Sequence, residues 1–209
     1  MKPQAGEPAA VAKASLRRQI LAARAGLSAD QRAAAGRAIR DALLALPQVQ
    51  MAGTVAAYYS IGAEPDTHGL VYALWKRGSY VLLPRLRPDM DLDWASYEGP
   101  DSLRAGPRGL TEPTEASRGV AAVSRADLVI VPALAVDRQG VRLGRGGGSY
   151  DRALARVGPQ VPTIALLYDA ELLDEVPAAA HDQRVRLVAS PAAGITSLPD
   201  GLPFSSPMP

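Results

Sequence analysis

The chain has 209 residues, of which 47% are hydrophobic, and a formal net charge of +2 at pH 7. A chain of this length and composition can bury a full hydrophobic core, so a single domain is the expectation. It contains no cysteine, which excludes a thiol nucleophile, a disulfide scaffold and a thiolate metal site, and it has only two histidines. Oxygen ligands are therefore favoured for any metal ion.

The pattern of charge and hydrophobicity predicts a cytoplasmic protein. The sequence has no apolar run of 18 residues and no hydrophobic segment of the signal-peptide kind at its N-terminus. Its basic residues form no long runs and are not interleaved with aromatic residues, as they are in many nucleic-acid binders. We expect neither a nucleic-acid nor a membrane partner, and a monomer or a weak homodimer.

The first fifty residues predict two helices. Residues 1–11 are rich in Pro, Gly and Ala and are interpreted as a flexible leader. Helical periodicity begins at residue 12 and continues to Gly26, which offers a stop. A second helix begins after Ser28, where Gln31 completes a capping box, and it runs to Pro47. The two segments together predict an N-terminal helical hairpin.

The rest of the chain alternates strands and helices. Residues 54–60 and 79–83 predict buried strands, and the helix between them makes a parallel βαβ unit. Residues 91–97 alternate polar and apolar side chains, which suits an edge or antiparallel strand. The remaining expected elements are strands over 127–131, 163–167 and 185–189 and a helix over 150–157.

This alternation predicts an α/β fold of three layers with a mostly parallel sheet. We expect one domain over residues 12–190. The segment 191–209 is rich in proline and has no periodicity, so it is interpreted as a poorly ordered or strapped-on tail. In such sheets ligands bind beyond the carboxyl ends of the strands.

The segment 140–152 carries the strongest functional signal. It contains five glycines, three arginines and one acid between a buried strand and a helix. Glycine lets backbone amides approach an anion, and arginine adds a planar cationic fork. The spacing matches neither the Walker A motif nor GxGxxG. The alternatives are a phosphate-binding loop or a flexible surface turn, and the long connection 133–148, which shows no obvious structure of its own, favours function.

Other charged residues are candidates for the same site. Lys13 and Arg17 lie four residues apart on the first helix, where they could grip a polyphosphate or form a solvated basic face. Glu64 follows the first strand and could accept hydrogen bonds from a ring or an amide, or be a surface charge. Asp151 could hold Mg²⁺ or oppose a helix dipole, and Asp182 could be a lone Mg²⁺ or water ligand.

In their order along the chain, these segments resemble the 5-formyltetrahydrofolate cyclo-ligase family. The core of the resemblance is the segment 142–152, RLGRGGGSYDR, and the other pieces support it by their order. Those pieces are Lys13-x-x-Leu16-Arg17, Glu64-x-x-Thr67, Leu83-Pro84-Arg85, residues 109–113, residues 131–141 and residues 177–185. The resemblance spans about residues 12–190.

The resemblance implies a Rossmann-like α/β/α fold and an ATP- and Mg²⁺-dependent conversion of 5-formyltetrahydrofolate to 5,10-methenyltetrahydrofolate, with release of ADP and phosphate. It also implies that the γ-phosphoryl group activates the formyl oxygen and that N10 then closes the ring. Such chemistry rests on positioning and charge stabilisation.

The resemblance also implies roles for single residues. Arg145 is the candidate for steadying the transferring phosphoryl group. ATP would be bound by Lys13, Arg17, Arg142, Leu143, Gly144, Arg145, Gly146, Gly147, Gly148, Ser149 and Tyr150. The folate would be bound by Tyr59, Glu64, Arg145, Gly146, Gly147, Gly148 and Ser149, with only one of Tyr58 and Tyr59 expected to face it. Mg²⁺ would be bound by Asp151 and Asp182.

Three positions depart from the family pattern. Ser149 stands where an aromatic residue is usual, Val136 where phenylalanine is usual, and Arg186 where a second acid is common. These departures keep a second hypothesis open, a non-catalytic nucleotide or folate binder of the same fold. A relative of the sugar-phosphate isomerases or CoA-transferases is a weaker third, since it gives the basic first helix and Asp151 no task.

Overall fold

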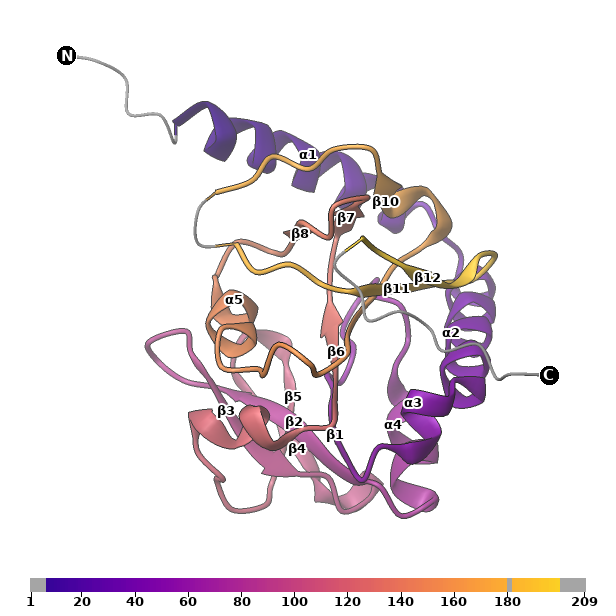
Figure 1. Ribbon diagram of the computed structural model, residues 1–209, viewed down its shortest axis with the longest axis vertical. Coiled ribbons are helices and arrows are strands. Elements are labelled where there is room, and N and C mark those ends of the chain that lie inside the picture. The colour runs from indigo at the N-terminus through magenta and orange to yellow at the C-terminus, as the bar shows by residue number, and fades with distance from the viewer. Residues whose placement is uncertain (1–6, 180–181, 200–209) are drawn as a thin grey trace.

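A computed structural model describes residues 7–179 and 182–199, and a seven-stranded sheet forms its centre (Figure 1). The strand order is β12-β11-β9-β6-β1-β2-β3. The five inner strands pair in parallel, and the edge strands β3 and β12 are antiparallel to their neighbours. This confirms the mostly parallel sheet and the antiparallel edge strand predicted over 91–97. The strands are β1 Thr54–Ala56, β2 Tyr80–Leu86, β3 Leu92–Ser96, β6 Leu128–Pro132, β9 Thr163–Leu166, β11 Leu187–Ser190 and β12 Gly194–Ser197.

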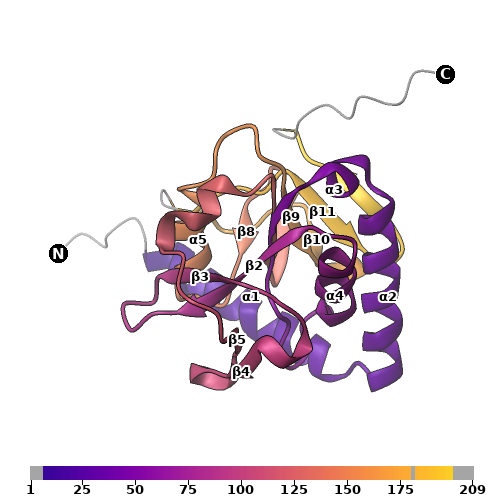
Figure 2. The same ribbon diagram turned by 90° about the horizontal axis from the view of Figure 1, so that it is seen from below.

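Helices cover both faces of this sheet, which confirms the three layers (Figure 2). One face is covered by α2 Ala29–Ala45, α3 Pro47–Met51 and α4 His68–Lys76. The other is covered by α5 Ser149–Leu154 and the 3₁₀ turn Val120–Arg125. The strands of a parallel sheet need cover on both sides because both faces are apolar.

Local sequence signals explain the start and end of α2. Ser28 Oγ accepts a hydrogen bond from Gln31 N at 3.2 Å, and Gln31 Oε1 accepts one from Ser28 N at 2.8 Å, so the predicted capping box is confirmed. Helix α2 ends at Ala45 with Leu46 as its C-cap, as expected for a helix that runs to Pro47. Pro47 then begins the short helix α3, in whose first turn its missing N–H costs nothing.

The N-terminal predictions need two corrections. Helix α1 spans Glu7–Ala25, so the helix begins within the expected leader 1–11, of which residues 1–6 lie outside the described structure. The expected helical hairpin is also wrong, since α1 and α2 bury their apolar stripes on different sheets. Ile20 of α1 packs on a small second sheet, whereas Ile39 and Leu43 of α2 pack on the central one.

Two of the three strands of that small sheet lie within the connection 133–148, where no structure was expected. The sheet consists of β7 Ala135–Asp137, β8 Arg142–Leu143 and β10 Leu172–Leu173, and α1 lies across it (Figure 1). Asp137 stabilises the turn between β7 and β8, because its Oδ1 accepts hydrogen bonds from Gln139 N and Val141 N at 2.8 and 2.9 Å. Strands of two and three residues are too short to show a period in the sequence.

The first part of the tail 191–209 is ordered and attached to the sheet edge, which fits the strapped-on alternative and places it within the domain expected to end at residue 190. Strand β12 lies inside it, because Ile195 and Thr196 pair with Ala189 and Val188 of β11. β-Branched residues suit such an edge strand. Residues 200–209 lie outside the described structure.

A hairpin completes the described elements. Strands β4 Leu103–Ala105 and β5 Thr111–Pro113 form it, next to β2. Short 3₁₀ turns lie at Pro100–Ser102, Pro107–Gly109 and Asp169–Glu171. In the described part of the chain, no helix combines the length and apolarity needed to cross a membrane.

Candidate active site

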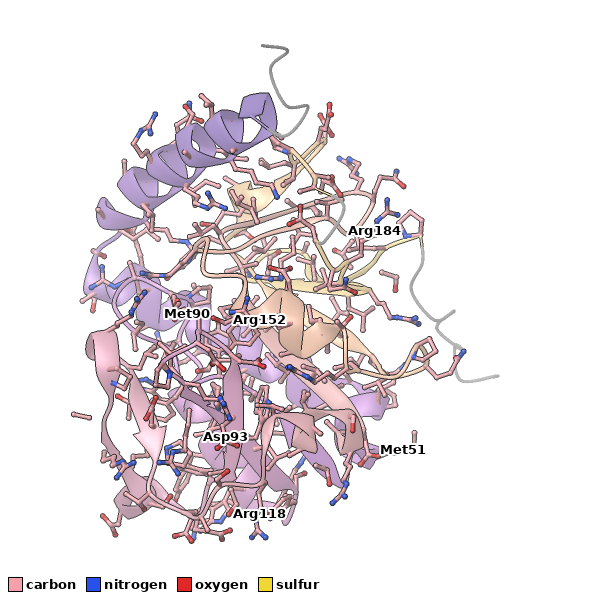
Figure 3. All side chains as sticks on the ribbon, turned by 90° about the vertical axis from the view of Figure 1, so that its left-hand side faces the viewer. Met51, Met90, Asp93, Arg118, Arg152 and Arg184 are labelled. Atoms are coloured by element: carbon pink, nitrogen blue, oxygen red, sulfur yellow. The ribbon has the colours of Figure 1, made fainter. Side chains whose placement is uncertain are left out.

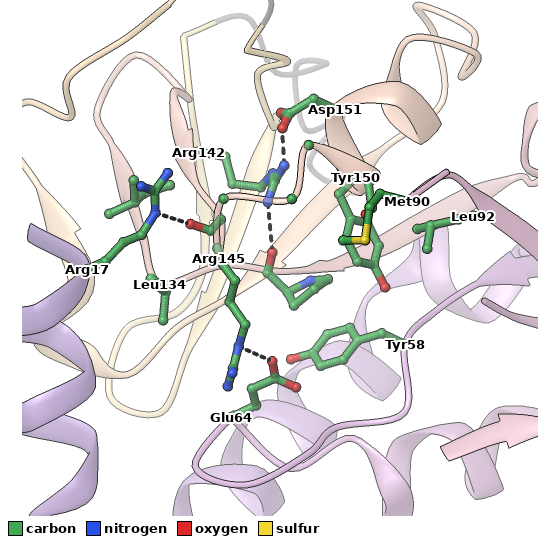
Figure 4. A pocket seen from close by; sticks show the side chains of 18 of the residues that line it. Arg17, Tyr58, Glu64, Met90, Leu92, Leu134, Arg142, Arg145, Tyr150 and Asp151 are labelled. Atoms are coloured by element: carbon green, nitrogen blue, oxygen red, sulfur yellow. Dashed lines mark hydrogen bonds and ion pairs between the residues drawn. The ribbon is translucent and has the colours of Figure 1, made fainter. Parts of the chain in front are cut away.

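A cavity of about 710 Å³ lies at the carboxyl ends of the central strands (Figure 4). Helix α1 and the small sheet form one side, and the segments that follow β1, β2 and β6 form the other. This is where ligands bind in open α/β sheets. The central sheet and the subdomain around α1 thus enclose a ligand-sized space.

Every site residue predicted from the sequence lines this cavity. Residues far apart in the sequence, on α1, after β1 and around β8, meet there. They are Lys13, Arg17, Tyr59, Glu64, Arg142, Leu143, Gly144, Arg145, Gly146, Gly147, Gly148, Ser149, Tyr150, Asp151 and Asp182.

The glycine loop has a backbone that other residues would not adopt easily. Gly146 and Gly148 have φ values of 103° and 67°, in the left-handed region that favours glycine. A Cβ on Gly147 would lie 2.8 Å from Cε of Met90, which packs against the loop. Figure 3 shows Met90 beside Arg152, which donates a hydrogen bond to the Met90 carbonyl at 2.6 Å. The loop is therefore held in a defined shape.

Two carboxylates in the cavity are each paired with a cation. Lys13 Nζ lies 2.5 Å from Asp182 Oδ2, and Arg142 Nη2 lies 2.9 Å from Asp151 Oδ1 (Figure 4). Arg142 is 4% exposed and also donates to the Pro132 carbonyl at 3.2 Å. Its Nε has no hydrogen-bond partner in the described structure. Arg142 therefore acts as a buried charge under the cavity, in contact with Asp151.

The same two carboxylates are the candidates for a metal site. Within the described residues, no group of three or more acidic, histidine or cysteine side chains could enclose a metal ion. Mg²⁺ usually binds through one or two carboxylates together with substrate phosphates and water. Asp151 and Asp182 fit a Mg²⁺ ion that arrives with a nucleotide, and they do not fit a metal held by the protein alone.

Arg145 links the glycine loop to the segment after β1. Its Nε lies 3.2 Å from Glu64 Oε1, and the Arg145 side chain is 52% exposed whereas that of Glu64 is 9% exposed (Figure 4). Glu64 Oε2 accepts a hydrogen bond from Ile61 N at 3.0 Å. The carboxylate is thus fixed, and the guanidinium is the movable partner.

Two tyrosines, the buried Tyr58 and the half-buried Tyr150, face the same space. Burial raises the pKa of Tyr58 and of Tyr150 above the ordinary value, and the negative charge of Glu64 raises both further. Their hydroxyl groups therefore remain protonated at neutral pH and can donate hydrogen bonds. Tyr59 stacks on His68 with ring centroids 3.9 Å apart. Both Tyr58 and Tyr59 line the cavity, and the expectation that only one of them faces the ligand stays a prediction.

Arg17 completes the cationic end of the cavity. Its Nε donates to the Gly144 carbonyl at 2.9 Å (Figure 4). A Cβ on Gly146 would lie 3.4 Å from Arg17 Cζ, so the guanidinium lies against the loop. Arg17 is therefore in contact with the loop, and the alternative of a solvated basic face does not apply to it.

Sequence reasoning missed the apolar end of the cavity. It is lined by Pro84, Leu86, Met90, Leu92 and Leu110, with Arg108 beside them. The available signal was weak because these residues come from β2, β3 and the loops beside them and share no motif. In the described structure, only Met90 and Arg108 among non-glycine residues have a positive φ, and both line the cavity. Such strain concentrates at functional sites.

The position of Gly144 gives a first prediction. A Cβ there would lie 2.7 Å from Arg142 Nη1, so Gly144→Ala should displace the guanidinium that contacts Asp151. We expect turnover to fall by about 10- to 100-fold, because small misplacements in a site have effects of that size. The control is Gly158→Ala, whose Cβ would meet Val161 at 3.7 Å, an ordinary contact. Equal activities of the two variants would contradict the role given to Arg142.

The fold and the cavity define an α/β protein that binds a ligand at the carboxyl edge of its sheet, with a glycine- and arginine-rich loop around it. The chain belongs to the 5-formyltetrahydrofolate cyclo-ligase family, whose sequence model matches residues 9–191. The resemblance drawn from the sequence is thereby confirmed.

Curated relatives and a solved structure agree with this assignment. The chain is 43% identical to the 5-formyltetrahydrofolate cyclo-ligase of Mycolicibacterium smegmatis over 150 residues, which are 69% of this chain and 77% of the relative. It is 32% identical to that of Escherichia coli strain K12 over 172 residues, 81% and 94% of the two chains. The 5,10-methenyltetrahydrofolate synthetase of Aquifex aeolicus superposes with a TM-score of 0.77 at 27% identity, covering 93% of this chain and 96% of that one.

Proposed function

We propose that the protein converts 5-formyltetrahydrofolate to 5,10-methenyltetrahydrofolate with ATP, releasing ADP and phosphate. The observation that carries this proposal is a single cavity with two unlike ends. One end gathers the glycine loop, cations and two carboxylates, which suits a nucleotide polyphosphate. The other end is apolar with a fixed carboxylate, Glu64, which suits a ring system with amide and amine donors.

The ATP phosphates would bind Lys13 and Arg17, and each of these cations would give up its partner in the free protein. Lys13 contacts Asp182, and Arg17 contacts the Gly144 carbonyl. An incoming polyphosphate offers Arg17 a charged acceptor in place of a neutral carbonyl, and hydrogen bonds to charged groups are about twice as strong as neutral ones. For Lys13 it offers several anionic oxygens in place of one carboxylate. The backbone amides of residues 144–149 would complete the phosphate site.

Mg²⁺ would be held by Asp151 and Asp182 together with those phosphates. Once bound, it neutralises charge on the phosphate oxygens. Release of Lys13 to the phosphates frees an oxygen of Asp182 from its ammonium partner. We expect Asp182→Asn to raise the Mg²⁺ concentration needed for half-maximal turnover by about 10-fold or more, from the loss of one of two carboxylate ligands. Titrating MgCl₂ at saturating ATP measures it, and an unchanged requirement would contradict this role.

The folate would occupy the apolar end. Glu64 would accept hydrogen bonds from the pterin ring, Tyr59 would contact the folate, and the loop from Arg145 to Ser149 would lie between the two substrates. The protonated hydroxyls of Tyr58 and Tyr150 face the same space and can donate to a formyl oxygen.

The chemistry requires positioning more than a protein nucleophile. The formyl oxygen attacks the γ-phosphorus, the bond to the β-phosphate oxygen breaks, and ADP leaves. N10 then attacks the activated carbon, the C–O bond breaks with release of phosphate, and N10 loses its proton, which leaves the cationic methenyl bridge. Arg145 would leave Glu64 for the transferring phosphoryl group, where a positioned cation stabilises developing charge.

The appearance of the methenyl-folate chromophore tests this function. Purified protein given 5-formyltetrahydrofolate, ATP and Mg²⁺ should produce the chromophore, and the same mixture without ATP should not. Tight binding of ADP or folate without turnover would instead support the non-catalytic binder, which Ser149 and Arg186 keep as an alternative. A cytoplasmic location and a monomeric or weakly dimeric state remain predictions.

A further inference from the structure

Arg108 is a cation on the apolar end of the cavity. It is exposed and lines the cavity beside Leu110 and Thr111, on the hairpin that packs next to β2. Within the described structure, no hydrogen-bond or ion-pair partner exists for its guanidinium, whereas the other arginines and the lysine of the cavity have partners. Those others are Lys13, Arg17, Arg24, Arg142 and Arg145.

The backbone of Arg108 has a conformation that is unusual for a residue with a long side chain. Arg108 has φ 58° and ψ 26°, Gly109 has φ 74°, and Leu110 N donates to the Pro107 carbonyl at 3.0 Å. Positive φ at both central positions is the mark of a type I′ turn, in which asparagine, aspartate or glycine is preferred at the first. A long cationic side chain occupies that position here. A strained residue that lines a cavity points to a function for its side chain.

The hairpin that carries Arg108 is firmly anchored. Buried Glu112 accepts a hydrogen bond from Leu86 N at 2.7 Å, and its side chain fills the space against Gly106, where a Cβ would lie 2.7 Å from Glu112 Cδ. Gly106 N donates to the Leu110 carbonyl at 2.8 Å, which closes the hairpin. Glu112 therefore serves to fix the turn, and the turn places Arg108 at the apolar end.

We propose that Arg108 binds the carboxylates of the glutamyl tail of the folate substrate. This inference rests on the proposed function. The pterin and formyl group must lie near Arg145 and the phosphates, so the tail extends toward the other end of the cavity. The tail carries at least two carboxylates, and the guanidinium fork matches a carboxylate with two parallel hydrogen bonds. Arg108 is then a specificity residue for the glutamylated form of the substrate.

The test compares Arg108→Asn with the control Arg104→Asn. Asparagine is favoured at this turn position, so the first variant removes the charge and keeps the hairpin. Arg104 is exposed on the same hairpin but does not line the cavity. Each protein is assayed with 5-formyltetrahydrofolate and with 5-formyltetrahydropteroate, which lacks the glutamate.

We expect Arg108→Asn to raise KM for 5-formyltetrahydrofolate by about 5- to 20-fold, as loss of a charged hydrogen bond does, with the effect confined to that KM. KM for the pteroate and KM for ATP should match those of the control. An unchanged KM for the folate, or an equal rise for both substrates, would overturn the proposal. If the wild-type protein shows no turnover, the proposed function fails. The role of Arg108 can then be tested separately by calorimetric titration, which compares the affinities of the two variants for the folate and for the pteroate.

Discussion

Arg145→Ala is expected to lower kcat by about 100- to 1,000-fold while the fold remains intact. Removal of one group that stabilises charge in a transition state typically has an effect of this size. Arg145 is half-exposed and contacts Glu64 through one ion pair, and without that pair Glu64 still accepts the hydrogen bond from Ile61 N. Stopped assays of the methenyl product, with thermal unfolding of the same samples, measure both quantities.

A matched control separates charge loss in the site from charge loss elsewhere. Arg138 forms an ion pair with Asp174, at 2.9 Å, in which both side chains are exposed, and it does not line the cavity. Arg138→Ala should keep its turnover and its unfolding temperature. Activity of Arg145→Ala within a factor of two of this control would refute the role of Arg145 in phosphoryl transfer.

The second large effect concerns stability and falls on Arg24. Arg24 is 2% exposed and forms two hydrogen bonds of 2.7 Å with Glu171, and it also donates to the Ala133 carbonyl at 2.7 Å. Burial lowers its pKa, but the hydrogen bond and charge of Glu171 raise it more, so the pKa lies above the ordinary value. The pair joins α1, which carries Lys13 and Arg17, to the rest of the protein.

Arg24→Ala leaves the Glu171 carboxylate buried without its cation. We expect the free energy of unfolding to fall by about 3–5 kcal/mol, the usual cost of breaking a buried ion pair by removing one partner. Urea titration followed by circular dichroism measures it. Arg138→Ala again serves as the control, with an expected change below about 1 kcal/mol because its ion pair is exposed. Equal changes in the two variants would show that the Arg24 pair does not anchor α1.

The sequence predicts the central sheet well and the added elements poorly. Apolar runs such as 127–131 and 163–167 identify strands because both faces of a parallel sheet are buried. Strands β7 and β8 have three and two residues, and their pairing depends on hydrogen bonds to Asp137, which no period reveals. The position of α1 depends on that small sheet, so the predicted hairpin of helices fails with it.

The cationic end of the site could be predicted, and the apolar end could not. The glycine loop and the charged residues have distinctive chemistry and a family pattern, and all of them reach the cavity. Their pairing could not be anticipated, because Lys13 and Asp182 lie 169 positions apart. Met90 and Arg108 carry no motif, and only their backbone conformation marks them.

The path of the formyl oxygen tests the central claim most directly, namely that one cavity brings the γ-phosphoryl group of ATP to the formyl group. In 5-formyltetrahydrofolate labelled with ¹⁸O in the formyl group, that oxygen should leave with the phosphate. Mass spectrometry of the inorganic phosphate after complete turnover should therefore find one labelled oxygen for each methenyl product formed. Unlabelled phosphate beside labelled water would contradict direct phosphoryl transfer and with it the proposed arrangement of the two substrates.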